Sequence, residues 1–460
     1  MSNLWSGRFD TEPDAETFEF GSSFRFDRRL FEDDVTGSVA WARALGAAGV
    51  LPGDEAHQIE TALTEILERG RIDPSFVDGP DEDVHSFVER LLVERLGDAG
   101  RRLHTGRSRN EQVSVDLRLY LLRRIPRLQR SLGRVVAALA AQAASAGDAL
   151  MPAFTHLRPA QPVLVAHFFL AHAAALRRDH ARLHAARDES DALPLGSGAI
   201  AGTSYAIDVE ALARDLGFSR VVANSIDASS DRDFAATFMY ASALTMVHLS
   251  RLAEDLVIFC GDAHRFFELS DALSTGSSMM PQKKNPDPLE LVRGKTGRAI
   301  GHLVGLLTTM KGLPSGYNKD LQEDKQSVFD TEDTLAGSLA AIRSVVHGLT
   351  LNREQAEAAA SGLLLATDVA DYLVGRGVPF RRAHEIVGAL VRKLVAERRE
   401  FGSLSLEEWR ASSDRFDADV VARVTPRVSV GAKRTPQSTA PGAVQAALED
   451  VQRWAIRAAG

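Results

Sequence analysis

The sequence predicts an all-α fold built around long helices, and three observations support this prediction. Aromatic residues make up only 7% of the 460 residues, whereas alanine, leucine, arginine and glutamate abound, a bias toward helix formers. In the middle of the chain, apolar residues recur at alternating steps of four and three, which is typical of a helix that packs along its neighbours. Turn-forming prolines and glycines, as in Leu51–Asp54 and Asp78–Asp81, instead punctuate the region before the middle.

Four stretches carry the long-helix pattern. At about 1.5 Å per residue, helices of about 20 to 30 residues are some 30 to 45 Å long, a length typical of bundle rods. The first is expected to kink at Pro126. Its continuation, Val135–Ala146, is apolar on more than one side, so we expect subunits to associate; the alternative is a monomeric bundle wrapped by its own end domains. The four stretches are Asp116–Leu139, Leu249–Phe259, Val292–Met310 and Leu335–Leu349.

Boundaries near residues 106 and 355 divide the chain into three expected domains. These are an N-terminal helical domain (1–106), a central long-helix bundle (107–355) and a small C-terminal helical domain (356–460). Neither boundary carries a flexible Gly/Ser or Pro linker. We therefore expect the three domains to pack together rather than to be strung out.

Charge and cysteine content exclude several classes of function. The 54 basic residues are outnumbered by 62 acidic ones, which gives a net charge of -8, so nucleic acid is not an expected partner. Cys260 is the only cysteine, which excludes a disulfide framework or a multi-thiolate metal site within one chain. The N-terminus does not resemble a signal peptide, and no apolar run approaches the roughly 18 residues of a membrane span. We expect a cytoplasmic protein with no membrane partner.

Familiar cofactor and catalytic motifs are absent or incomplete. Gly294-Lys295-Thr296 resembles the end of a phosphate-binding loop, but residue 289 is leucine where that motif requires glycine. The segment 196–201 formally fits the dinucleotide fingerprint, yet no strand-like run precedes it, so a tight turn is the better interpretation. No zincin, paired-cysteine or serine-hydrolase motif is present. We expect neither a metal ion nor a cofactor.

One loop does carry a chemical pattern. Residues 274 to 290 place polar, cationic and turn-forming residues directly before a long helix, and three prolines exclude helix there. Ser277, Lys283 and Asn285 thus lie where positive potential and backbone N–H donors gather, a suitable environment for an oxyanion. The alternative is a solvated basic turn.

The loop 276–286 resembles the signature loop of the aspartase/fumarase superfamily, and its Gln-Lys-Lys-Asn-Pro-Asp version is similar to that of the argininosuccinate lyase family. Further blocks resemble that family in the same order along almost the whole chain. They are Leu4–Phe9, Leu103–Asn110, Thr155–Leu157 with Pro159–Pro162, Leu195–Ser204, Asn224–Phe234 and Tyr317–Lys325. The resemblance implies a homotetramer whose central bundles form a twenty-helix core and whose active sites are shared between subunits, without a cofactor.

The resemblance also implies a reaction, the elimination of arginine from argininosuccinate to release fumarate, which ends arginine biosynthesis. By resemblance, His156 and Ser277 transfer the protons, and Glu290 hydrogen-bonds the histidine. Lys283 is of the right type to hold the doubly negative aci-carboxylate intermediate. An unperturbed serine is too weak an acid to ionise at neutral pH, so Ser277 can be the carbon base only in a dry, cationic pocket. We favour that assignment, and the reverse one stays open.

Substrate contacts also follow from the resemblance. The residues concerned are Ser23, Arg109, Asn110, Thr155, Asn285, Tyr317, Gln322 and Lys325. For each, a purely structural hydrogen bond is the alternative. The chain departs from the family at Glu111, at Arg158 and at Gln326-Ser327, and none of these departures removes a proton-transfer residue. The competing functions are the sister reactions on adenylosuccinate, aspartate or malate, and a non-catalytic role like that of some lens crystallins.

Overall fold

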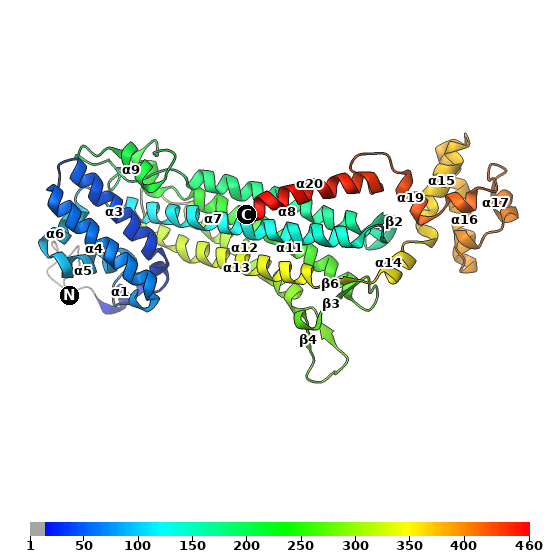
Figure 1. The fold of residues 1–460 in the computed structure, drawn as a ribbon, viewed down its shortest axis with the longest axis horizontal. Coiled ribbons are helices and arrows are strands. Elements are labelled where there is room, and N and C mark those ends of the chain that lie inside the picture. The colour runs from blue at the N-terminus through cyan, green and yellow to red at the C-terminus, as the bar shows by residue number, and fades with distance from the viewer. Residues whose placement is uncertain (1–13) are drawn as a thin grey trace. The chain divides into compact units, whose positions relative to one another are not determined.

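The computed structural model describes residues 14–460, so the resembling block Leu4–Phe9 lies outside the described residues. The predicted all-α class is confirmed, and the middle of the chain holds five long helices rather than four (Figure 1). The unpredicted one, α8, buries a regular stripe that includes Ala173, Asp179, Ala186 and Ser190. Small and polar residues in that stripe hide its periodicity from a search for apolar side chains. The five helices are α7 (Arg109–Ala146), α8 (Val165–Ser190), α11 (Asp233–Cys260), α12 (Asp287–Met310) and α13 (Asp324–His347).

Contacts between residues divide the chain into two compact units. Unit 1 comprises the residues up to Leu128 together with 181–244 and 297–335, and unit 2 comprises 129–180, 245–296 and 336–460. The five boundaries between units therefore fall inside the five long helices, one in each. This division does not test the three domains expected from the sequence, which stay a prediction.

Unit 1 combines halves of the long helices with short ones. Its core includes Trp41, Leu45 and Ile59, none of which is exposed to solvent. Helix α3 packs closely on α4, since a Cβ atom at Gly46 would lie 2.7 Å from that of Ala56. The short α-helices are α1 (Ala15–Gly21), α2 (Phe24–Asp27), α3 (Phe31–Ala47), α4 (Gly53–Ile72), α5 (Val84–Leu96), α6 (Asp98–Arg101), α9 (Val209–Leu216) and α10 (Ser225–Ser230), with 3₁₀ turns at Arg28–Leu30, Pro74–Phe76, Arg102–His104 and Lys319–Glu323.

Unit 2 holds the remaining halves, three small antiparallel sheets and the C-terminal helices, which bury a core of their own around Trp409 and Phe416. The paired strands are β1 (Leu150–Thr155) with β2 (Arg158–Leu164), β3 (Phe267–Leu269) with β6 (Leu349–Leu351), and β4 (Thr275–Gly276) with β5 (Lys284–Asn285). The helices are α14 (Arg353–Ala359), α15 (Ala366–Gly375), α16 (Phe380–Glu397), α17 (Leu406–Ser412), α18 (Val420–Arg423), α19 (Pro426–Ala432) and α20 (Pro441–Ala459), with 3₁₀ turns at Asp271–Leu273, Gly362–Leu365 and Phe401–Ser403.

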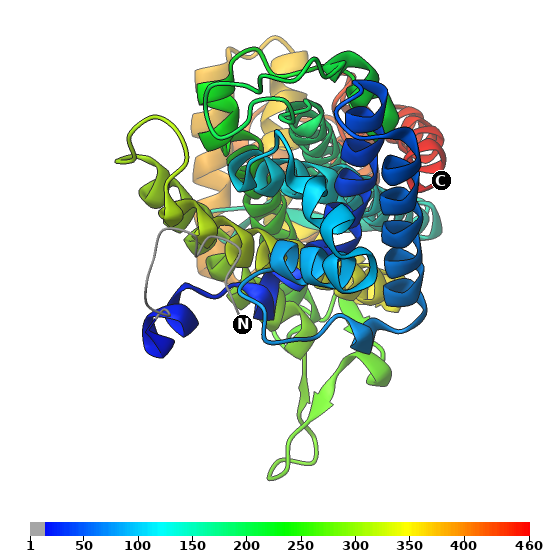
Figure 2. The same cartoon turned by 90° about the vertical axis from the view of Figure 1, so that its left-hand side faces the viewer.

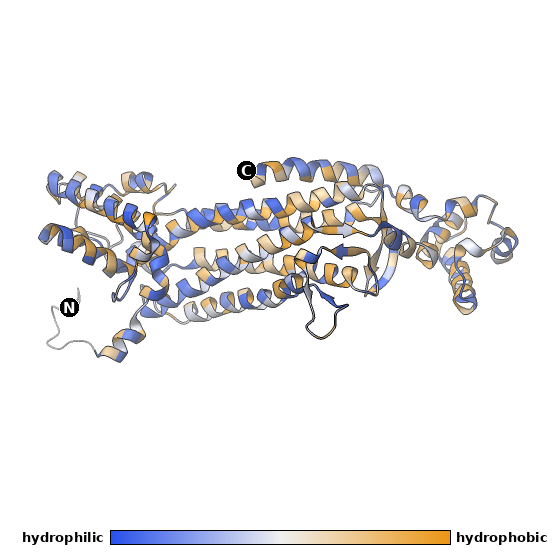
Figure 3. Ribbon diagram, turned by 60° about the horizontal axis from the view of Figure 1, so that its bottom comes forward, coloured by the Kyte–Doolittle hydropathy of each residue, from blue (hydrophilic) through white to orange (hydrophobic). Residues whose placement is uncertain are grey.

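The hairpin of β4 and β5 stands apart from the helices of its own unit in two perpendicular views (Figures 1 and 2). Its strands are mainly hydrophilic, whereas hydrophobic residues concentrate along the long helices (Figure 3). Among residues 14–460, no single helix has the length and hydropathy of a membrane span, and only the bent pair Arg353–Ala359 and Gly362–Gly375 passes that test jointly.

Candidate functional site

The turn between β1 and β2 presents His156 to solvent in unit 2. Because Thr155 pairs with Arg158, the turn consists of His156 and Leu157, and both have positive φ angles, 55° and 58°. Two consecutive positive φ angles are typical of the type I′ hairpin turn, whose twist matches that of the flanking strands. Here neither of the two turn residues is glycine. Phe154 anchors the turn by packing on Phe259 at 5.5 Å between ring centroids. The imidazole of His156 is exposed and has no hydrogen-bond or ion-pair partner among residues 14–460.

The predicted lack of helix in residues 274 to 290 is confirmed for 274–286, where the β4–β5 hairpin forms, but it is wrong for the last four residues, because α12 already begins at Asp287. Pro288 lies in the first turn of that helix, where a proline is tolerated because no intrahelical N–H bond is required there. Ser277 lies just after β4, where its Oγ accepts hydrogen bonds from the backbone N–H groups of Met280 at 3.0 Å and Met279 at 3.3 Å. These bonds fix the hydroxyl on a partly exposed loop. Lys283 is exposed near the other end of the loop. Asn285 follows in β5 and pairs with Thr275.

Glu290 lies in the first turn of α12, with half of its side chain exposed. Its carboxylate pairs with Arg293 at 3.5 Å, and it makes no hydrogen bond to His156 within the described part of the chain. The predicted contact between Glu290 and the histidine is therefore not formed within one chain. It stays a prediction for the assembled protein.

Unit 1 gathers predicted substrate-binding residues from distant blocks of sequence. Ser23 donates from Oγ to the buried Asp27 carboxylate at 2.5 Å. Burial raises the pKa of that carboxyl group, and the nearby positive charge of Lys325 opposes the rise. Burial also raises the pKa of Tyr317 to about 12. Gln322 donates to the carbonyl oxygen of Gly21 at 3.0 Å, two residues from Ser23.

The start of α7 contributes two more predicted contacts in unit 1. The Arg109 guanidinium donates to Ser86 Oγ at 3.3 Å and lies 3.6 Å from the Asp83 carboxylate. Asn110 donates from Nδ2 to the carbonyl oxygen of Ala199 at 3.1 Å. The loop containing Ala199 is thus docked against the first turn of α7.

That loop is the segment that formally fits the dinucleotide fingerprint, and it is the tight turn that the sequence favoured. Gly196, Gly198 and Gly202 all have positive φ angles. The Gly198 N–H group donates to the Glu111 carboxylate at 2.9 Å, so this amide is not free to bind a phosphate. Burial raises the pKa of Glu111 to about 7.

Comparison with known proteins shows to which family this chain belongs. A model of the lyase family matches residues 7–301, and a model of the argininosuccinate lyase C-terminal domain matches residues 363–431. The argininosuccinate lyase of Moorella thermoacetica is 48% identical over 97% of this chain and 96% of its own length, and that of Heliobacterium mobile is 46% identical over 97% and 98%. The chain belongs to the argininosuccinate lyase family. The superfamily fold is also that of an EDDS lyase variant with bound fumarate, with a TM-score of 0.84, 26% identity and coverage of 97% and 91% of the two chains.

This argininosuccinate lyase family member also contains a buried ionisable cluster that sequence reasoning missed. His85 Nδ1 lies 2.8 Å from Asp34 Oδ1 and 3.3 Å from Asp116 Oδ2, and Gln112 donates to the same Asp34 oxygen at 2.6 Å. The three ionisable groups lie close enough to share one metal ion. The guanidinium of Arg107, also buried, supplies positive charge to both carboxyl groups. The sequence signal that could have revealed this cluster is Asp116, an acidic residue on the side of an amphipathic helix that faces the core.

Different forces act on the two carboxyl groups of this cluster. Burial opposes ionisation of Asp34, but His85 and Arg107 prevail and lower its pKa below the usual range. Burial and the negative charge of Asp34 together raise the pKa of Asp116 well above the usual value. Asp34 therefore carries the negative charge, and Asp116 keeps its proton.

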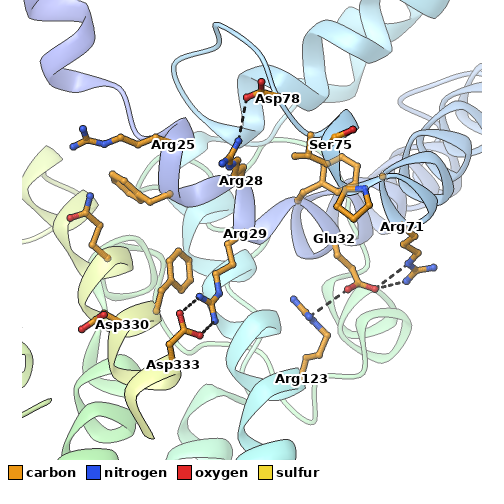
Figure 4. A pocket seen from close by; sticks show the side chains of 17 residues that line it. Arg25, Arg28, Arg29, Glu32, Arg71, Ser75, Asp78, Arg123, Asp330 and Asp333 are labelled. Carbon is orange, nitrogen blue, oxygen red and sulfur yellow. Dashed lines mark hydrogen bonds and ion pairs between the residues drawn. The ribbon is translucent and has the colours of Figure 1, made fainter. Parts of the chain in front are cut away.

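A cavity of about 1110 Å³ in unit 1 of this lyase is lined by none of the predicted site residues, although Gln326 in its lining directly follows Lys325. Figure 4 shows that Arg29 points at Asp333, with which it pairs at 2.6 Å, and Arg28 at Asp78, at 3.2 Å, whereas Arg25 points away from both carboxylates. Most of the arginine charges in this cavity are thus compensated by neighbouring carboxylates.

Proposed function

We propose that this chain catalyses the reversible elimination of argininosuccinate to arginine and fumarate, without a metal ion or cofactor. The observation that carries the proposal is the 48% identity to an argininosuccinate lyase over 97% of the chain. Ser277 on a projecting hairpin and His156 on an exposed turn supply a hydroxyl and an imidazole for proton transfer to and from a bound substrate.

The proposed chemistry starts with removal of a proton from the carbon next to a substrate carboxylate. Ser277 takes that proton, and Lys283, Asn285 and the amides of the hairpin stabilise the doubly negative aci-carboxylate. The C–N bond to the guanidino group then breaks and releases fumarate, and His156, made more basic by Glu290 from another subunit, donates a proton to the departing guanidino nitrogen. The hairpin covers the bound substrate and excludes water, which is the condition under which a serine hydroxyl can ionise. Exchanging the roles of Ser277 and His156 would use the same residues.

Substrate recognition is proposed to lie mainly with the residues that unit 1 gathers. Ser23, Tyr317, Gln322 and Lys325 offer hydroxyl, amide and ammonium groups for the succinyl carboxylates and the arginine part. Arg109 and Asn110 add a guanidinium and an amide from the start of α7, and Thr155 adds a hydroxyl beside His156. Ser23 and Lys325, which lie far apart in the sequence, both interact with Asp27, and this supports a common site.

The proposed assembly is a cytoplasmic homotetramer in which the central domain, 107–355, provides the shared core. Support comes from the part of α12 that belongs to unit 1, where Ile300, Val304 and Leu307 are between 41% and 57% exposed. The glycines on this helical segment, such as Gly301, have no neighbouring atoms near where a Cβ would lie. An apolar face with room for close approach is typical of a helix that packs against another subunit.

A panel of substrates tests the function. Purified protein is mixed separately with argininosuccinate, adenylosuccinate, aspartate and malate, and fumarate is followed by its ultraviolet absorbance. We expect fumarate from argininosuccinate alone, with arginine formed in equal amount. Fumarate from adenylosuccinate alone would overturn the substrate assignment, and no fumarate from any of the four would overturn the function.

A further inference from the structure

We propose that Arg158 is a further substrate-binding residue, and that its guanidinium binds the substrate carboxylate on the carbon that carries the guanidino nitrogen. The inference deepens the proposed function and rests on it, because it concerns the same reaction. The resemblance to the family assigns no role to Arg158, which is one of the positions where this chain departs from the family.

The register of the β1–β2 hairpin determines the face on which Arg158 lies. Arg158 pairs with Thr155, and Pro159 pairs with Phe154. Paired residues of two antiparallel strands share a face of the hairpin, and successive residues alternate between the two faces. Phe154 packs inward, on Phe259 and the aromatic residues around it. Thr155 and Arg158 therefore lie together on the opposite face, away from this aromatic cluster.

Arg158 has no anionic partner within the described residues. Its side chain is exposed, and it makes no hydrogen bond or ion pair among residues 14–460. Other arginines of unit 2 are paired, as Arg293 is with Glu254 and Arg177 with Asp450. A guanidinium is always charged, and its planar set of N–H donors fits a carboxylate. The charge of Arg158 is therefore available to an anion that is not part of the hairpin.

Thr155 and His156 indicate which anion this is. Cross-strand neighbours have Cβ atoms about 5 Å apart, so Arg158 extends beside the Thr155 hydroxyl, a proposed substrate contact. The next residue, His156, is proposed to protonate the departing guanidino nitrogen. The carbon bonded to that nitrogen also carries one of the two succinyl carboxylates. A cation beside His156 therefore faces this carboxylate, whereas Lys283 and Asn285 are proposed to hold the other one, which becomes the aci-carboxylate.

The chemistry of this carboxylate determines the kinetic effect that we expect. It is ionised in the substrate and stays ionised while fumarate forms, so it gains no charge in the transition state. A guanidinium that binds it stabilises the bound substrate and the transition state about equally, which lowers KM and leaves kcat almost unchanged. Both succinyl carboxylates remain in fumarate, and the arginine product contains neither. Binding of fumarate, but not of arginine, should therefore depend on Arg158.

Steady-state kinetics of Arg158→Gln and Arg158→Lys test the proposal, with fumarate and arginine added separately as inhibitors. In Arg158→Gln we expect KM for argininosuccinate and the inhibition constant of fumarate to rise about tenfold, the scale of losing one charged hydrogen-bonding partner. We expect kcat to change less than about threefold and the inhibition constant of arginine less than about twofold. Arg158→Lys keeps the charge but not the planar donor set, so its constants should lie between those of wild type and Arg158→Gln. The matched control is Arg392→Gln, which removes an exposed arginine of α16 in the same unit and should leave all of these constants unchanged.

Unfolding midpoint and oligomer size are measured for every variant. A wild-type KM in Arg158→Gln would overturn the proposal, and so would an inhibition constant that rises as much for arginine as for fumarate. A smaller oligomer in Arg158→Gln would assign the guanidinium to a contact between subunits, which also overturns the proposal. Wild-type protein without activity on argininosuccinate would instead indicate failure of the proposed function.

Discussion

Ser277→Ala is expected to lower kcat for argininosuccinate by about three to four orders of magnitude, the scale of losing a proton-transfer group that no neighbour replaces. The hydroxyl lies on a partly exposed loop, where it only accepts bonds from Met279 and Met280. Its removal should therefore leave helicity, unfolding midpoint and oligomer size unchanged. Initial rates of fumarate formation at saturating substrate give the measurement.

The matched control for this prediction is Ser278→Ala. Ser278 is the next residue on the same hairpin, and its side chain is exposed. We expect kcat to fall by less than about threefold, because this hydroxyl has no proposed part in proton transfer. Near-normal turnover in Ser277→Ala would exclude Ser277 from the chemistry, and equal losses in both variants would point to disruption of the hairpin instead.

Replacing Asp34 and Asp116 by asparagine is expected to affect stability in opposite directions, although the two side chains share one cluster. Asp34→Asn removes the buried negative charge that faces His85 and Arg107, and should lower the free energy of unfolding by about 2 kcal/mol. In that variant Asp116 can supply the missing negative charge only in part, because its Oδ2 lies 3.3 Å from His85 Nδ1, whereas Asp34 Oδ1 lies 2.8 Å from it. Asp116→Asn mimics a carboxyl group that is already protonated, so it should preserve or raise stability.

The stability difference between wild type and Asp116→Asn is also expected to change with pH in a defined direction. Because the pKa of Asp116 is raised by folding, its contribution to stability is complete below the unfolded value of 3.8 and is lost as pH rises toward the folded value. Wild type should therefore lose stability relative to Asp116→Asn as pH rises from the unfolded value of 3.8 toward the raised folded value. Urea unfolding midpoints, measured at one protein concentration because subunits associate, provide the test. A destabilised Asp116→Asn at all pH values would contradict the assigned proton.

The sequence predicted the helical class and the chemically important loop because both leave local signals. Apolar spacing marked α11, α12 and α13, and the prolines around Ser277 excluded helix. Helix α8 gave a weaker signal, since Asp179 and Ser190 interrupt a buried stripe that also contains Phe169, Leu176 and Leu183. The positive φ angle at His156 depends on the register of β1 and β2, which no single segment reveals.

The buried networks were also beyond sequence reasoning. Asp34, His85 and Asp116 come from α3, α5 and α7, and only their packing shows which carboxyl group keeps a proton. Arg232 and Asp324 are 92 positions apart, so their ion pair has no local signature. The resemblance identified the site residues individually, whereas only the structure shows which buried charged groups lie beside them.

The central claim is that His156 and Ser277 act together in sites that subunits share, and mixing two inactive variants tests it most directly. His156→Ala and Ser277→Ala chains are co-refolded in equal amounts, with wild type and each variant treated alone as controls. If each site takes its histidine from one chain and its serine from another, about a quarter of the sites contain both, and that fraction of wild-type activity should return. A mixture no more active than the separate variants, while refolded wild type regains its activity, would contradict the account.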